Sequence, residues 1–137
     1  MAKVTLVLVT HSQKMLEVEC DEVTLPGGEG EMGVLPGHTG LIPTLVPGLL
    51  AYRESGAEHR FAVSSGFCEM SNDTLTVLVD RAQKAEEIDV DEARKDIESA
   101  TAALGQAGSE LDEVAKLQEK LADAEARLLV AGGGSAH

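Results

Sequence analysis

The sequence contains no tryptophan, and its aromatic residues are limited to Tyr52, Phe61 and Phe67. Its two cysteines, Cys20 and Cys68, are too far apart for a C-x-x-C redox or zinc motif and too few for a disulfide framework. We therefore expect both thiols to be reduced and half-buried in strands. No apolar run approaches the roughly 20 residues that a membrane-spanning helix needs, so the sequence predicts no direct membrane insertion.

Basic residues are also scarce, with 11 Lys and Arg against 24 Asp and Glu, which gives a net charge of −13. Nucleic-acid binding depends on clustered Lys and Arg, so this composition argues against nucleic acid as a partner. It argues equally against adsorption on an anionic membrane surface. The first residues, Met1 to Val9, lack the cleavage pattern of a signal peptide. They predict a strand in a protein that stays in the cytoplasm.

Proline is absent after Pro47, and the composition changes near residue 86. Before this point, short β-branched segments alternate with turns that contain Gly, Pro, Asn or Asp, which is typical of an antiparallel sandwich or barrel. The expected strands are 4–10, 15–20, 22–25, 41–46, 49–53, 59–64, 68–70 and 75–80. The sequence therefore predicts two domains, a β-sandwich over residues 1–86 and a helical part over residues 87–137.

The helical part carries two apolar stripes with alternating spacings of three and four residues. One runs from Val90 to Ala107 and the other from Leu111 to Leu128, and the glycines of residues 105–108 separate them. Asp89 can cap the first helix and Ser109 the second. This pattern predicts an antiparallel two-helix hairpin. Its alanine-rich seam buries modest area, so the hairpin is held weakly and can open. A permanently folded two-helix arm stays the alternative.

Motifs that suggest chemistry do not fit their contexts. Residues 28–33 match G-x-G-x-x-G, but residues 34–37 predict a strand and a turn where a dinucleotide site requires a helix. The four histidines have no ligand spacing to one another or to the cysteines, and Ser65 lacks the G-x-S-x-G context. The sequence therefore predicts no catalytic residue, no metal site and no active site of its own.

Residues 25–50 are dense in Gly and Pro yet keep many large apolar residues, which favours a shaped contact surface over a flexible linker. Four runs form a distinctive set: LPGGEGEMGVLPGH at 25–38, PGL at 47–49, SSGFCEM at 64–70 and LTVLVD at 75–80. Together they resemble the epsilon subunit of F-type ATP synthases, called delta in mitochondria. The resemblance implies a flattened antiparallel β-sandwich of about ten strands followed by a helical hairpin.

The resemblance also implies a function. It implies that the chain is a non-catalytic rotor subunit in the central stalk of a proton-translocating ATP synthase. Such a subunit lies peripherally on the cytoplasmic face of the bacterial inner membrane. The sandwich would bind the gamma subunit and touch the c-ring of the membrane sector. By position, the implied c-ring contacts are Glu29, Gly30, Glu31 and Met32, and the implied gamma contacts are His38, Thr39 and Leu41.

In this family the helical tail alternates between a form folded against the sandwich and an extended form. The extended form reaches the alpha/beta catalytic head and blocks ATP hydrolysis. Residues 87–137 carry 12 acidic and 5 basic side chains, a net charge of −7. Like charges weaken docking on an acidic segment of the head, so we expect weak or differently built inhibition.

Some members stabilise the folded tail with ATP through an Ile/Leu-Asp-x-x-Arg-Ala pattern and arginines on the last helix. In the run from Ile88 to Arg94 the arginine is displaced and no alanine follows it. Arg127 stands alone on the last helix, with Asp123 one turn earlier. The sequence therefore favours no cofactor. A regulatory ATP site made by Ile88, Asp89, Arg94 and Arg127 stays the alternative.

Two other classes of function also stay open. A small enzyme would need a pocket with convergent polar groups. A free-standing adaptor with a helical interaction tail would self-associate through the two apolar stripes.

Overall fold

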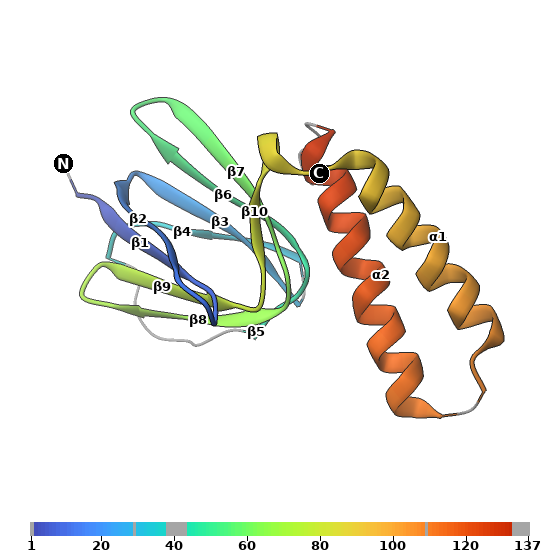
Figure 1. The fold of residues 1–137 in the computed structure, drawn as a ribbon. Helices are drawn as coiled ribbons and strands as arrows, with labels where there is room; N and C mark the ends of the chain where they lie inside the picture. The colour runs from blue at the N-terminus through green and yellow to red at the C-terminus, as the bar shows by residue number, and fades with distance from the viewer. Residues whose placement is uncertain (1, 29, 38–43, 109, 133–137) are drawn as a thin grey trace.

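The computed structural model describes residues 2–28, 30–37, 44–108 and 110–132. Within these ranges ten strands form a β-sandwich and two longer helices form a hairpin beside it (Figure 1), so the predicted fold class is confirmed. The strands are β1 (Val4–Val9), β2 (Lys14–Cys20), β3 (Glu22–Gly27), β4 (Gly30–Val34), β5 (Thr44–Leu45), β6 (Gly48–Glu54), β7 (Ala57–Val63), β8 (Gly66–Ser71), β9 (Thr74–Val79) and β10 (Ala82–Lys84). The helices are the 3-10 turn η1 (Ala85–Glu87), α1 (Val90–Gln106) and α2 (Leu111–Ala131).

One hydrogen-bonded path joins the strands in the order β10-β7-β6-β3-β5-β8-β9-β1-β2, and β4 pairs with β3 beside it. The path curls over the core, with β8 and β9 on one side and β6 and β7 on the other (Figure 1). Among the described strands, β1 and β9 form the one parallel pair. Parallel neighbours need a long connection, which the strands between them in sequence supply.

The core follows from the alternation of side chains along each strand. Leu75, Val77 and Val79 of β9 point inward and are at most 2% exposed, whereas Leu78 faces outward and is half-buried. Gly66 begins β8 at a close approach of two backbones. A Cβ at this position would lie 2.1 Å from the carbonyl oxygen of Leu78, so the pairing of β8 with β9 requires glycine there.

Two short strands, β4 and β10, were not expected from the sequence. β4 contains two glycines and a glutamate, which have low strand propensity. It forms because pairing with β3 places Val34 beside Val23 and Met32 beside Leu25. These side chains join the core, which offsets the poor local propensity.

Of the two helix caps predicted from the sequence, the one at the start of α1 is confirmed. A carboxylate oxygen of Asp89 accepts a hydrogen bond from the backbone N–H of Glu92 at 3.0 Å, as the sequence predicted. Ser109, the predicted cap of the second helix, lies outside the described residues. The residue before α2 is Glu110, whose side chain makes no capping hydrogen bond.

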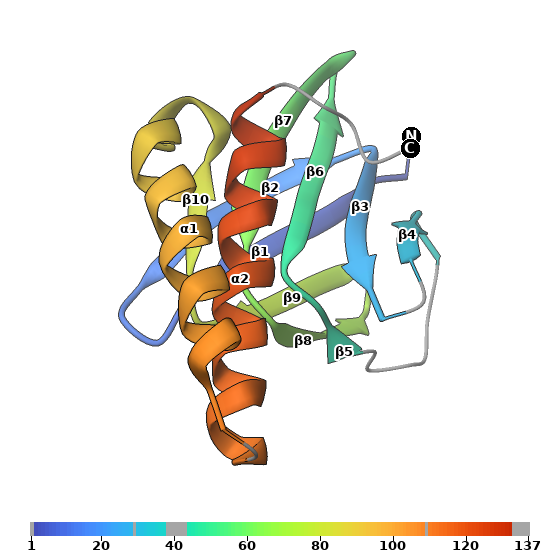
Figure 2. The ribbon, with the colours of Figure 1, turned by 90° about the vertical axis from the view of Figure 1, so that its right-hand side faces the viewer.

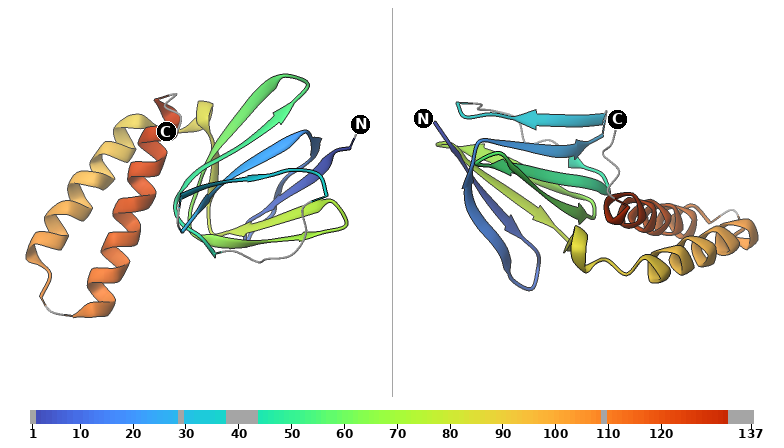
Figure 3. Two further views of the ribbon diagram at one scale, coloured as in Figure 1. Left: turned by 180° about the vertical axis from the view of Figure 1, so that it is seen from behind. Right: turned by 90° about the horizontal axis from the view of Figure 1, so that it is seen from above.

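The helix α2 lies between the sandwich and α1 (Figure 1; Figure 3) and runs across β6 and β7 (Figure 2). Ala93 and Ala100 of α1 and Ala124 of α2 are at most 2% exposed, so the expected alanine-rich seam is present. The predicted apolar stripe did not include three buried residues of α2, which are Ala126, Arg127 and Val130. Arg127 is only 4% exposed.

Candidate functional site

The hairpin meets the sandwich first through an apolar cluster near the end of α2. Val130 is fully buried in a cluster with Leu49, Ala62 and Ile88. Full burial of one valine contributes about 1.5–3 kcal/mol. The guanidinium of Arg60 donates a hydrogen bond to the carbonyl oxygen of Val130 at 3.4 Å. This end of α2 is therefore anchored to β6 and β7.

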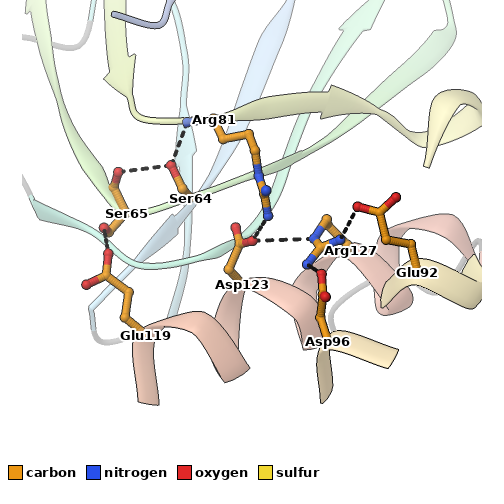
Figure 4. Close-up of polar contacts among 8 residues, drawn as sticks. All are labelled: Ser64, Ser65, Arg81, Glu92, Asp96, Glu119, Asp123 and Arg127. Carbon is orange, nitrogen blue, oxygen red and sulfur yellow. Dashed lines mark hydrogen bonds and ion pairs between the residues drawn. The ribbon is translucent and has the colours of Figure 1, made fainter. Parts of the chain in front are cut away.

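The middle of α2 is joined to the sandwich by polar contacts (Figure 4). The hydroxyl of Ser65 donates to a carboxylate oxygen of Glu119 at 2.5 Å, and the guanidinium of Arg81 pairs with the carboxylate of Asp123. Glu119 and Asp123 are four residues apart, so a helix places them on the same face. The hydroxyl of Ser64 accepts a hydrogen bond from the backbone N–H of Arg81 at 2.8 Å, which fixes the start of the arginine side chain.

Arg127 joins the two helices (Figure 4). Its Nη2 donates to Asp96 of α1 at 2.6 Å, and its Nη1 lies 4.0 Å from Glu92. Its Nε lies 3.4 Å from Asp123, close enough for an ion pair but without hydrogen-bond geometry. A buried guanidinium needs such paired acids because water does not reach it. Asp123 consequently contacts two arginines, one from the sandwich and one from its own helix.

The structure shows where the residues of the alternative ATP site lie. Ile88 packs in the apolar cluster, and the carboxylate of Asp89 caps α1. Arg94 is exposed on α1, whereas Arg127 is buried and paired with acids of its own chain. An ATP site at these positions stays a prediction.

The β3–β4 hairpin carries the described part of the implied c-ring contact. Gly30 has a positive φ of 123°, Glu31 is exposed, and Met32 is half-buried against the core. Glu29, and the implied gamma contacts His38, Thr39 and Leu41, lie outside the described residues.

A second surface feature is an apolar row across three strands, which the sequence analysis did not identify. In the register of the sheet, Phe67 of β8 lies beside Leu78 of β9, and Leu78 lies beside Val9 of β1. All three side chains face outward, and Phe67 is 50% exposed. With Glu69 and Thr76 they line a shallow groove of about 220 Å³. We call these five residues the Phe67 groove.

In the described ranges, no three His, Cys, Asp or Glu side chains are arranged to hold a metal ion. No described helix has the length and apolar character needed to cross a bilayer. Cys20 and Cys68 are free thiols, fully buried where half-burial was expected. Burial raises the pKa of both thiols, that of Cys68 to about 11, so both stay protonated and unreactive at neutral pH.

Comparison with known proteins gives two consecutive family matches. The model described as "ATP synthase, Delta/Epsilon chain, beta-sandwich domain" matches residues 3–85, and the one described as "ATP synthase, Delta/Epsilon chain, long alpha-helix domain" matches residues 86–132. The ATP synthase epsilon chain of Citrifermentans bemidjiense is 48% identical over 109 residues, which cover 80% of this chain and 74% of the relative. That of Anaeromyxobacter dehalogenans is 41% identical over 128 residues, which cover 93% and 97%.

Solved structures agree. A chain in the Euglena gracilis mitochondrial ATP synthase, in a structure of OSCP, F1 and the c-ring, superposes with a TM-score of 0.80 at 26% identity over 96% of this chain and 82% of that chain. A chain in the central stalk and c-ring of the Tetrahymena thermophila enzyme has the same fold, with a TM-score of 0.71 at 15% identity over 94% and 96%. The chain therefore belongs to the ATP synthase delta/epsilon family, as an epsilon subunit of the F-type enzyme.

Proposed function

We propose that this chain is a rotor part of the central stalk, which links the catalytic head to the c-ring and regulates ATP hydrolysis through its helical hairpin. The observation that carries the proposal is the full-length likeness to epsilon chains, with both the sandwich and the helices matched. The chain would act by binding and by changing shape, without an active site of its own. It would lie peripherally on the cytoplasmic face of the bacterial inner membrane.

The Phe67 groove is the surface that we assign to the gamma subunit. An exposed apolar patch on a small domain marks a contact site, since water contact with these groups is unfavourable. Thr44, the first described residue after the implied contacts His38, Thr39 and Leu41, pairs with Phe67 in the sheet. The two sets of residues would then contribute to one docking surface.

The β3–β4 hairpin is the part that we assign to the c-ring. Its second strand, β4, lies beside the main path of the sheet and pairs with β3 (Figure 2). Exposed Glu31 offers hydrogen-bond acceptors to the polar loops of the ring, and Gly30 allows the tight turn.

The helical hairpin of α1 and α2 is suited to regulation because few contacts hold it on the sandwich. It is held by one apolar cluster, the hydrogen bond of Arg60 and two side-chain contacts from α2, as described above. Two packings of such an arm can differ by only a few kcal/mol, so a partner that binds the released form can shift the balance. A released α2 of 21 residues would be about 32 Å long, enough to reach along the stalk toward the alpha/beta head.

The test is reconstitution of ATP synthase that lacks this subunit, with either the full chain or a chain cut after Ala85. Both forms should restore ATP-driven proton pumping, because both carry the docking surfaces. Only the full chain should lower ATP hydrolysis. Equal hydrolysis with the two forms would refute the regulatory role, and failure of both to restore pumping would refute the stalk assignment.

A further inference from the structure

Among the described carboxylates, only that of Asp123 contacts both an arginine of the sandwich and an arginine of the helical hairpin. On one side it pairs with Arg81, which lies between β9 and β10 of the sandwich. On the other it lies 3.4 Å from Arg127, whose guanidinium binds Asp96 of α1. The side chain of Asp123 is 15% exposed and that of Arg127 is 5% exposed, so water screens these charges poorly.

We propose that Asp123 couples two events: closure of α1 on α2, and docking of the hairpin on the sandwich. Its carboxylate completes the set of acids around buried Arg127, and the same carboxylate holds Arg81. Docking therefore favours the closed hairpin, and closure positions Asp123 for docking. The physiological meaning of this coupling rests on the proposed regulatory role, but the coupling itself is a property of the chain alone.

The charges explain why loss of Asp123 would affect both events. Without its carboxylate, the guanidinium groups of Arg81 and Arg127 would approach each other with no negative charge between them. Arg127 is too buried to recover hydration, so either its helix turn shifts or α2 moves off the sandwich. Both movements disturb the pairing with Asp96.

Glu119 provides a matched comparison within the same helix. It lies one turn before Asp123 and also reaches the sandwich, through Ser65. It has no ion pair with Arg127 or with any described residue of α1. Loss of Glu119 should therefore weaken docking directly and reduce closure by a smaller factor, which reaches α1 only through the coupling.

The experiment measures the two events separately by native-state thiol labelling of the full chain. A62C reports docking, because Ala62 is 4% exposed in the cluster with Val130. A100C reports closure, because Ala100 is 2% exposed on α1, which packs on α2. The native thiols are buried with raised pKa values and set a low background rate.

In D123N, both reporters should be labelled about tenfold faster, the factor expected for loss of one charged hydrogen bond. In E119Q, the labelling rate of A62C should rise by the larger factor and that of A100C by a clearly smaller one, because Glu119 acts on closure only through docking. D123E, which keeps the charge, should recover most of the protection and guards against a general folding defect. The exposed acid Glu125 gives the control E125Q, which should match the parent at both reporters.

Three results would overturn the proposal: D123N that changes only one reporter, E119Q that changes both reporters equally, or D123E that labels as fast as D123N. Binding to the gamma subunit plays no part in this assay. A negative result therefore leaves the stalk assignment intact, and failure of the stalk assignment would leave these labelling rates unchanged.

Discussion

Replacement of Phe67 by serine should weaken docking on the stalk and leave the fold nearly unchanged. Phe67 is 50% exposed, so about half of a side-chain area of roughly 200 Å² is free to be covered by a partner. Burial of roughly 100 Å² contributes about 2.5 kcal/mol at 25 cal/mol per Å². Loss of this contribution raises the dissociation constant roughly 60-fold.

The assay is isothermal titration of the full chain into an alpha/beta/gamma subcomplex that lacks it. The matched control is L111S, because Leu111 is 82% exposed at the start of α2, away from the Phe67 groove. L111S should bind within about twofold of the parent, and both variants should unfold at nearly the parent urea concentration. Binding of F67S at parent affinity, or equal weakening by L111S, would contradict the assignment of the groove.

Two predictions concern the stability of the sandwich. G66A should lose about 3 kcal/mol of unfolding free energy, because its Cβ would lie 2.1 Å from the Leu78 carbonyl oxygen. In the control G33A, the new Cβ has no neighbour within 4 Å, so this variant should lose less than about 1 kcal/mol. Equal losses of unfolding free energy for G66A and G33A in urea titrations would contradict a tight approach of the β8 and β9 backbones at Gly66. Because burial raises the pKa of Cys68 to about 11, its contribution to stability is complete below the unfolded pKa near 9 and is lost as pH rises toward 11. C68A should therefore lose less stability than the parent between pH 8 and 10.5, and parallel losses would contradict the cause given for the shift.

Local patterns predicted much of the fold. Alternation and turn residues identified most strands, and Asp89 identified the start of α1. The strand β4 was missed because its glycines are poor strand formers and only its pairing with β3 makes it extended. The parallel pairing of β1 with β9 depends on contacts between the first and ninth strands, which local sequence does not encode.

Two features of the candidate sites were not predicted from the sequence: the burial of Arg127 and the exposure of Phe67. An arginine three residues after the seam residue Ala124 was not counted as buried, although Asp96 and Asp123 could have signalled that its charge has partners. Exposure of Phe67 was also missed. The alternation that buries Cys68 and Met70 places Phe67 and Glu69 outside, so this signal was present in the sequence.

The most direct test of the account places a photoreactive phenylalanine analogue at position 67 in the intact ATP synthase. Irradiation should give one main adduct, between this chain and the gamma subunit, since the Phe67 groove is assigned to that contact. An adduct with the c-ring or the catalytic head in its place, or no adduct in an assembly that contains the chain, would contradict the claim that the sandwich docks on the shaft through this face.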